Sequence, residues 1–479
     1  MIDFDALSGA LPRWLETRRW FADKGRGIAR AVIEDGLTEA VDDDALLLAI
    51  VRVEYRHGDS SRYFVPMVWT AHVGASEVIT AMPGATSTGA VIDGVEAPWF
   101  GRWLIEAMNG KAASQARWTF TSEPAASHVL ASAAQAPVTV MRAEQSNTSL
   151  RYGNEAMVKL VRRLQPGPNP DEEMLRALAK AGFASVPHYL GGASWRALDG
   201  EAHPLALAQA FVPNLGDGWS WMLRRLRELT GPESAVALDY ASPERLLGRR
   251  TGEMHVALSR VAEPEVAAET ATSESIQADI ARVRRAVGQT VSLLQESEAM
   301  LPEPLRAGLP SIASGLEDAT SRAEGFGAEA ETVRIRVHGD YHLGQTLRTP
   351  QEDWVIIDFE GEPARPVAER RQKTSALKDV AGMLRSFAYA RGAAERNQVA
   401  ASAPLASWET EARQAFLEGY REAVLEAPMA LVPADDREFA AALAAWELDK
   451  ALYEVAYEVR NRPDWVELPL RSLLPRLQE

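Results

Sequence analysis

Apolar and polar positions alternate along several short stretches in the first part of the chain. Between Ala45 and about Val73, the runs ALLLAIVRVEYRH and YFVPMVWT carry β-branched and aromatic side chains on either side of a short polar turn, a pattern typical of strands. After the helix-like stretch APWFGRWLIEAMNGK, three more extended runs follow one another within residues 138–164. The pattern predicts a β-rich first part that includes a strand meander.

The second part of the chain repeats apolar residues at helical spacing. The segment NPDEEMLRALAKAG places Asn169 at the N-cap, Pro170 at the first helical position and Gly182 past the end, which predicts a helix. From Trp219 onward the pattern is mostly helical, apart from one hairpin-like island. That island begins with TVRIRV and continues with GQTLR and a turn. It ends with the apolar run WVIID, whose last residue is Asp358. We therefore expect an α+β protein with a short hairpin inside its helical half.

Composition narrows the class of protein. The chain has 479 residues, of which 46% are hydrophobic and 25% are charged, and this predicts a soluble protein of two or three domains. An acidic N-terminus without a long apolar run favours a cytoplasmic location with no membrane role. There are no cysteines, and the formal charge of −16 argues against nucleic acid as a partner. An anionic cofactor such as ATP would need a local basic residue.

The string VHGDYHLGQ carries the first candidate chemistry. It places Asp340 where a strand passes into a loop, with His338 two residues before it and Gln345 five residues after it. This spacing matches the H-x-D-x-x-x-x-N catalytic loop of kinases except at the last residue, and a carboxylate in this position can accept the proton of an attacking hydroxyl group. Two other interpretations stay open: a turn ordered by His338, and a zinc site of His338 and His342 that lacks a third ligand.

A second carboxylate follows the last strand of the island. Asp358 begins the sequence Asp358-Phe359-Glu360, and closing the hairpin would bring it beside Asp340 and Gln345. Carboxylate and amide oxygens are the ligands that Mg²⁺ prefers. The sequence therefore predicts Gln345 and Asp358 as magnesium ligands.

Residues upstream of the island are candidates for holding ATP. Lys159 lies on the predicted strand AMVKL and Glu173 on the capped helix, so they could form the lysine–glutamate clamp of kinases, although a strand-end lysine is more often solvated. Backbone groups near Gln209 and Phe211, in AQAFVPN, could pair with adenine, or the segment is an ordinary strand end. The turn EQSNTS stands where kinases have a glycine-rich loop, but it contains no glycine. It either binds phosphate or forms a simple hairpin turn. The candidate phosphate-binding residues are Ser146, Asn147 and Thr148.

The C-terminal segment WELDKALYEVAYEVRNRPDW predicts a helix that ends before Pro463 and has two distinct faces. One face is ordinary core, and the other mixes aromatic rings with a cation, which suits either further packing or a cleft that binds a sugar. The core face carries Leu448, Leu452, Val455 and Val459, and the mixed face carries Trp446, Lys450, Tyr453 and Tyr457.

Several of these strings together resemble the actinobacterial maltokinases, which are related to aminoglycoside phosphotransferases and eukaryotic-like kinases. The strings are RRWFADKGR, EQSNTS, KLVRRLQPGPNPDEE, VHGDYHLGQTLR, IIDFEGEPARPVAERR, LKDVAGMLRSFAYA and ELDKALYEVAYEVRNRPDW. The resemblance implies a bilobal kinase-like fold with a β-rich N-lobe, a mostly helical C-lobe and an N-terminal β-rich cap domain. The expected limits are 1–90 for the cap, 91–210 for the N-lobe with an intermediate subdomain, and 211–479 for the C-lobe.

The same resemblance implies an activity and roles for individual residues. ATP and Mg²⁺ would be cofactors, maltose would be phosphorylated at its anomeric hydroxyl to maltose 1-phosphate for α-glucan and glycogen synthesis, and trehalose synthase would be a possible partner. Asp340 would be the catalytic base, Gln345 and Asp358 the metal ligands, and Lys159 with Glu173 the phosphate clamp. The candidate acceptor residues are His342, Glu360, Lys450, Tyr453 and Tyr457.

Two alternatives remain. A kinase for glucosamine or another monosaccharide would use the same catalytic residues, and an amino sugar would need carboxylates such as Glu360, Glu362 or Asp449. A catalytically inactive kinase-like binding module is the alternative from another class. The nucleotide-binding motifs G-x-x-x-x-G-K-[ST] and G-x-G-x-x-G and the hydrolase motif G-x-S-x-G have no match in the sequence.

Overall fold

The computed structural model describes residues 3–74, 77–83, 88–111, 117–141, 147–230, 242–362, 365–397 and 402–473. The chain divides into two compact units. The first comprises Met1–Glu173 with Pro187–Val212, and the second comprises Met174–Val186 with Pro213–Glu479. Within the described ranges, no helix combines the length and the apolar character that a membrane span requires.

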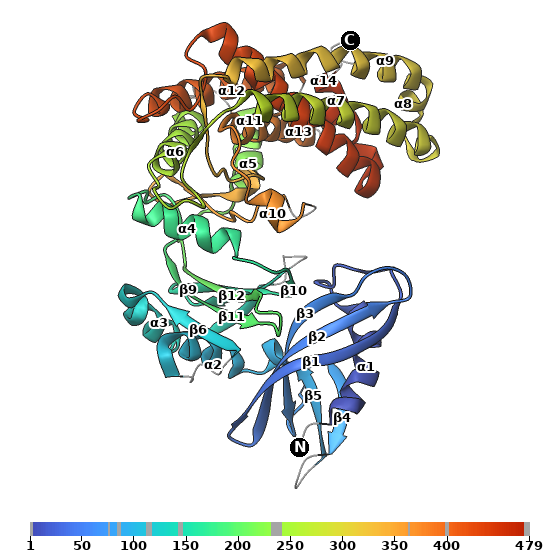
Figure 1. Cartoon of the computed structure of the whole chain (residues 1–479), viewed down its shortest axis with the longest axis vertical. Coiled ribbons are helices and arrows are strands. Elements are labelled where there is room, and N and C mark those ends of the chain that lie inside the picture. The colour runs from blue at the N-terminus through green and yellow to red at the C-terminus, as the bar shows by residue number, and fades with distance from the viewer. Residues whose placement is uncertain are drawn as a thin grey trace. The chain divides into compact units, whose positions relative to one another are not determined.

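An antiparallel sheet forms the start of the first unit (Figure 1), in the order β1-β2-β3-β5-β4, with the short strand β10 paired to β3. Helix α1 (Phe4–Thr17) packs on it through Leu7, Leu11 and Leu15, which are fully buried in a core with the sheet. The strands predicted between Ala45 and Val73 are therefore confirmed. The bounds are β1 (Ile28–Val41), β2 (Asp44–Tyr55), β3 (Ser61–Thr70), β4 (Val78–Pro83), β5 (Thr88–Asp93) and β10 (Arg163–Leu164).

A second sheet of the first unit has the order β6-β11-β12-β9-β8-β7 and contains the predicted meander. It shares a hydrophobic core with the first sheet, to which Ile50 and Phe64 contribute from one sheet and Leu150 and Val158 from the other. The strands are β6 (Trp118–Ser122), β7 (Val138–Met141), β8 (Asn147–Tyr152), β9 (Ala156–Val161), β11 (Tyr189–Arg196) and β12 (Ala202–Ala210), and short helices include α2 (Phe100–Glu106) and α3 (Ser127–Ala133).

The two faces of this second sheet differ because side chains alternate along a strand. Leu150 on β8 is paired with Val158 on β9, and both side chains enter the shared core. The neighbouring pair, Ser149 and Lys159, must therefore point to the other face. The sheet thus presents Lys159 on the face turned away from the first sheet.

Helix α4 (Pro170–Lys180) begins as its sequence predicts. The side-chain oxygen of Asn169 accepts the backbone N–H of Asp171 at 2.8 Å, and Gly182 takes the left-handed conformation, with φ of +79°, two residues beyond the helix. This pairing satisfies a donor that the first turn of a helix leaves free.

The second unit is mostly helical, as the sequence predicts, and its one predicted hairpin is formed by β15 (Thr346–Arg348) and β16 (Trp354–Ile356). A second short pair joins β13 (Glu269–Thr270) to β14 (Val333–Arg334). The longer helices are α5 (Gly218–Thr230), α6 (Ser242–Ser259), α7 (Ser273–Glu296), α9 (Leu309–Ala319), α11 (Leu377–Arg396), α12 (Ser402–Val424) and α13 (Asp436–Asn461), and the shorter ones are α8 (Glu303–Ala307), α10 (Val367–Arg370) and α14 (Glu467–Leu473).

Helices α6 and α12 pack closely because glycines stand where they cross. A Cβ atom on Gly248 of α6 would lie 1.9 Å from the carbonyl oxygen of Phe416, and one on Gly419 of α12 would lie 2.1 Å from that of Arg245. Both obstacles are backbone atoms, which cannot rotate away. Glycine at these positions is therefore a packing requirement.

We predict that Gly248→Ala destabilises the protein by about 3 kcal/mol, since overpacking against backbone forces the helices apart. Gly288→Ala is the matched control, because Gly288 lies inside α7 and an added Cβ atom there has no neighbour within 4 Å. That control should be neutral or up to about 1 kcal/mol more stable. Denaturant unfolding measures both changes, and equal stability of the two variants would contradict the packing argument.

Candidate active site

The β15–β16 hairpin brings Gln345 and Asp358 together. Gln345 ends a short 3₁₀ turn (Leu343–Gln345), and its carbonyl oxygen accepts the N–H of Ile357 at 3.0 Å. Its side-chain nitrogen donates to a carboxylate oxygen of Asp358, also at 3.0 Å. A cation held by both side chains would need the amide of Gln345 turned so that its oxygen, rather than its nitrogen, stands beside the Asp358 carboxylate.

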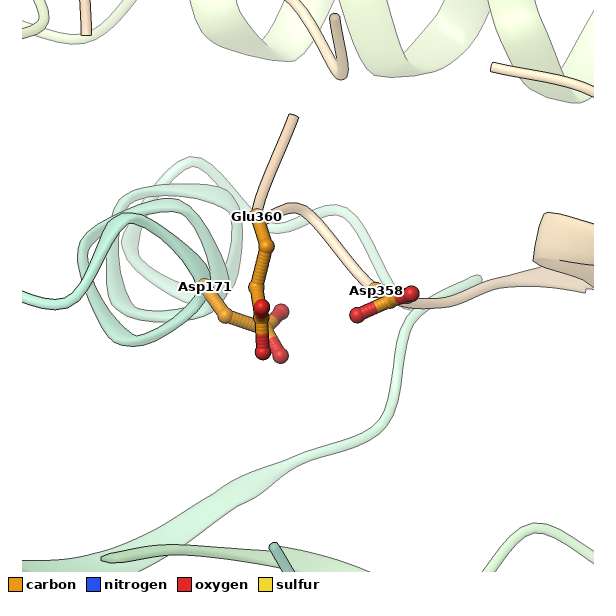
Figure 2. A group of neighbouring side chains, drawn as sticks. All are labelled: Asp171, Asp358 and Glu360. Atoms are coloured by element: carbon orange, nitrogen blue, oxygen red, sulfur yellow. The ribbon is translucent and has the colours of Figure 1, made fainter. Parts of the chain in front are cut away.

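Glu360 lies close to Asp358, and Figure 2 shows both side chains on the segment that follows β16. A carboxylate oxygen of Asp358 lies within 4.8 Å of one of Glu360. Asp358 also has a positive φ of 69°, which a residue other than glycine adopts only under the constraint of its surroundings. Two carboxylates and an amide oxygen fit a hard divalent cation, so Glu360, expected at the acceptor, has the geometry of a third metal ligand.

Asp340 pairs with a cation from helix α13. Lys450 Nζ lies 3.0 Å from a carboxylate oxygen of Asp340 and 3.2 Å from one of Glu362. Burial alone would raise the pKa of Asp340, but the charge of Lys450, with smaller contributions from His342 and His338, outweighs burial and holds that pKa well below its usual range. Burial likewise opposes the charge on Lys450, and the two carboxylates overcome it and raise the pKa of that ammonium group. Asp340 is therefore an ionised carboxylate.

The loop that carries Asp340 is held by Asp379, a residue that sequence reasoning missed. Its carboxylate accepts the backbone N–H groups of His338 at 2.7 Å and Gly339 at 2.9 Å, and its other partner is His255 Nε2 at 3.1 Å. Asp379 is 1% exposed, so this carboxylate is satisfied by protein groups. The available signal was an acidic residue inside the apolar stretch LKDVAGMLRSF, since a buried carboxylate needs partners.

The two histidines of the loop make bonds within the loop and hairpin. His338 Nε2 lies 2.9 Å from the carbonyl oxygen of Ile357, and His342 Nδ1 accepts the N–H of Gly344 at 3.0 Å. Burial lowers the pKa of His342, which favours its neutral form. These contacts fit a loop-ordering role, and contact of His342 with an acceptor stays a prediction.

In the first unit, Lys159 pairs with Asp171 at 3.0 Å. Asp171 lies in the first turn of α4 (Figure 2) and is buried, and it precedes the expected partner, Glu173, by two positions. Residues two apart on a helix point in different directions. Asp171 is therefore a partner of Lys159 that the sequence did not indicate, and the clamp role of Glu173 stays a prediction.

The other residues predicted to bind the nucleotide lie in different surroundings. Thr148 pairs with Leu160 on the core side of the sheet, and its hydroxyl accepts a hydrogen bond from Arg162 at 2.9 Å, so its side chain cannot share a ligand with Lys159. Ser146 lies outside the described residues, and a role of the neighbouring Asn147 in phosphate binding stays a prediction. The N–H of Phe211 already donates to the carbonyl of Glu155 at 3.0 Å, and Gln209 lies within β12, so adenine pairing there also stays a prediction.

The mixed face of helix α13 divides into parts with different surroundings. Trp446 is buried, and its indole N–H donates to Glu329 at 3.1 Å; burial raises the pKa of Glu329 to about 7. The Tyr453 ring centre lies 4.8 Å from Lys450 Nζ, and burial raises the pKa of Tyr453 to about 12. Tyr457 is 46% exposed. Lys450 thus contacts the carboxylate of Asp340 and Tyr453 lies beside Lys450, whereas Trp446 is largely packed.

A pocket of about 380 Å³ adjoins the catalytic loop. Its wall includes Gly339 of that loop, Glu362, which shares Lys450 with Asp340, and Trp446 and Asp449 of α13. The wall is dense in charge of both signs, which suits a ligand with many hydroxyl groups. The acidic residues are Asp279, Glu362, Glu369 and Asp449, and the basic residues are Arg282, Arg334, Arg365, Arg370, Lys373 and Lys378.

Comparison with known proteins finds relatives that are sugar kinases. Residues 14–109 match the sequence model described as the maltokinase N-terminal cap domain. The chain is 31% identical to the glucosamine kinase of Streptacidiphilus jiangxiensis, with 88% of each chain covered, and 28% identical to that of Mycolicibacterium smegmatis, with 78% of this chain and 87% of the relative covered. A solved glucosamine kinase in complex with glucosamine, ADP and inorganic phosphate superimposes with a TM-score of 0.68 at 25% identity, covering 98% of both chains. The predicted kinase-like α+β fold with an N-terminal cap is confirmed.

We predict that Lys450→Met raises the pH at which activity is lost on the acid side. Without the ammonium group, burial dominates and the pKa of Asp340 rises, so the carboxylate becomes protonated at a higher pH and cannot accept a proton. The pH profile of kcat measures the change. Lys180→Met, at a lysine paired only with the exposed Glu263 among the described residues, is the control, and identical acid limbs in both variants would contradict the prediction.

Proposed function

Because the chain belongs to the maltokinase-like family of sugar kinases, we propose that it transfers the γ-phosphoryl group of ATP to glucosamine. Relatives named glucosamine kinase, one of them solved with ADP, support a sugar phosphotransferase that uses a nucleotide. The acceptor is the part of the proposal that rests on this chain's own residues.

The observation that carries the proposal is the bridge made by Lys450. It connects Asp340 of the catalytic loop to Glu362, and Glu362 lines the 380 Å³ pocket. The bridge places the pocket wall one ion pair away from the carboxylate that could accept a proton, although Asp340 does not itself line the pocket. A phosphoryl acceptor held by the pocket wall would have to extend its hydroxyl group to Asp340.

In the proposed reaction, Asp340 orients the acceptor hydroxyl and takes its proton as the new O–P bond forms and the bond between the γ-phosphorus and the bridging oxygen of ADP breaks. A carboxylate with a lowered pKa is a weak base, so the proton moves late, when the hydroxyl oxygen has already begun to bond to phosphorus. Lys450 keeps the carboxylate ionised and oriented. Gln345, Asp358 and Glu360 would hold a divalent cation, which supplies positive charge to the phosphate oxygens.

In the first unit, Lys159 is the proposed ligand of phosphate oxygens. Asp171 keeps its ammonium group in place at 3.0 Å, and Lys159 stands on the strand face opposite the hydrophobic core. A lysine held in this way is the local cation that a chain of net charge −16 needs for binding an anionic nucleotide.

One feature of the pocket favours glucosamine over maltose as the acceptor, alongside the relatives named glucosamine kinase. The pocket volume of about 380 Å³ is near the small end for ligand pockets, which suits one sugar ring better than two. The carboxylate of Asp449 in its wall is paired with Arg282, so an ammonium group would have to compete with that arginine for it. Maltose is the second candidate, since the matched cap domain is described as that of maltokinases.

An acceptor panel tests this proposal. We expect ADP release from Mg·ATP with glucosamine to exceed that with maltose, glucose or trehalose by at least about tenfold in kcat/KM, the ratio that about 1.4 kcal/mol of transition-state binding gives. A preference for maltose would assign the second candidate. ADP release that no acceptor increases would instead identify an inactive binding module.

Asp340→Asn should lower kcat by a factor of about 10² to 10⁴, since the amide cannot accept the proton, while nucleotide affinity stays within about twofold. Steady-state kinetics and nucleotide titration measure the two effects. Asp318→Asn, at an exposed position of α9, is the matched control. A near-normal kcat in the Asp340 variant would remove this residue from the mechanism.

A further inference from the structure

The first unit contains a larger cavity, of about 890 Å³, that the proposed reaction does not use. Its wall comes from both sheets of the unit and from the segment after α1, and includes Trp20, Asp93, Thr148 and Arg162. We infer that this cavity is a second binding site, for a neutral carbohydrate, separate from the acceptor pocket and from Lys159.

The register of the second sheet separates the cavity from Lys159. Thr148 and Leu150 of β8 line the cavity, and they alternate with Ser149, which is paired with Lys159. Val138, paired with Tyr152, lines it as well. Since neighbouring side chains on a strand point to opposite faces, a ligand here binds the back of the sheet that presents Lys159 on its front.

Arg162 gives the cavity a buried polar group with unused bonding capacity. Its side chain is fully buried; Nε donates to Thr148 at 2.9 Å, and Nη2 donates to Asp93 at 3.0 Å. Its remaining nitrogen, Nη1, has no hydrogen-bond partner among the described residues. Protein atoms cover Nη1, and a buried donor without an acceptor costs about 1–3 kcal/mol. A ligand oxygen that came within reach of Nη1 would remove that cost.

The sequence string RRWFADKGR, which the proposed reaction leaves without a role, supplies one wall of the cavity through Arg18, Arg19 and Trp20. Asp23 of the same string fixes this segment to the first sheet, since it accepts hydrogen bonds from the hydroxyl groups of Tyr55 at 2.7 Å and Tyr63 at 2.6 Å. The wall is therefore built in advance of binding.

The chemistry of the wall favours a neutral ligand with many hydroxyl groups. Three arginines face three carboxylates, so the formal charges cancel, and an anion or a cation would meet both signs. An indole ring and charged side chains of both kinds are what sugar rings and their hydroxyl groups contact. With more than twice the volume of the acceptor pocket, the cavity suits an oligosaccharide. The charged residues are Arg18, Arg19, Glu77, Asp93, Glu96 and Arg162.

The full-length protein with ¹³C-labelled valine methyl groups tests the site without any change to its wall. Val140 lines the cavity and is paired with Leu150, whereas Val355 on β16 lies in the second unit. Addition of maltotriose should shift the Val140 signal, assigned by Val140→Ile, and leave the Val355 signal in place. If maltotriose does not shift the Val140 signal, or if only inorganic phosphate shifts it, the carbohydrate site does not exist as inferred.

Matched variants of β7 give an independent measurement. Val140→Trp fills the cavity, whereas Thr139→Trp places the same side chain at the next, exposed position of the strand. Calorimetric titration should show at least tenfold weaker maltotriose binding for Val140→Trp and unchanged binding for Thr139→Trp. Equal binding by both folded variants would place the sugar elsewhere, including the acceptor pocket. Neither experiment depends on catalysis, so this inference can fail while the proposed function holds.

Discussion

The candidate site depends on one buried ion-pair arrangement, in which Lys450 is shared by Asp340 and Glu362. Glu362 is in turn paired with Arg365, so two cations stand against two carboxylates in a region where the Glu362 side chain is 2% exposed. Removing one member of a buried pair leaves an uncompensated charge and costs about 3–5 kcal/mol. The arrangement therefore fixes the catalytic loop, the pocket wall and helix α13 relative to one another.

Contacts of neighbouring residues hold this ion-pair arrangement in place. The carboxylate of Asp379 accepts two backbone N–H groups of the loop that carries Asp340. One of them belongs to Gly339, whose φ of +86° is a conformation that glycine adopts readily. Helix α13 is held against α11 by Arg385, which donates to Glu454 at 2.7 Å. A carboxylate fixed on two sides in this way loses little further freedom when an acceptor binds.

The sequence predicted those parts of the fold and site that follow from local patterns. The β-rich start, the capped helix after Asn169 and the β15–β16 hairpin each show a periodicity or a cap that needs no distant partner. The juxtaposition of Gln345 and Asp358 followed from closing that hairpin. By contrast, the pairing of Lys159 with Asp171 depends on the rotation of a helix, and the support from Asp379 depends on a contact across 41 residues of chain. Spacing in the sequence determines neither. The side chain of Thr148 lies on the other face from Lys159, because strand register decides which face a residue occupies.

The alternation along β8 and β9 also explains how one sheet can serve two kinds of chemistry. Lys159 and Ser149 give one face a cation and a hydroxyl, while Thr148 gives the other face the group that holds Arg162. A change at a single position of β8 therefore acts on one face only, but a shift of register by one residue would exchange all of these side chains at once. The buried contact of Arg162 with Asp93 ties the first sheet to the second and so resists such a shift. The first sheet thereby supports the strand that presents Lys159. This support does not depend on which ligand binds in the cavity behind that strand.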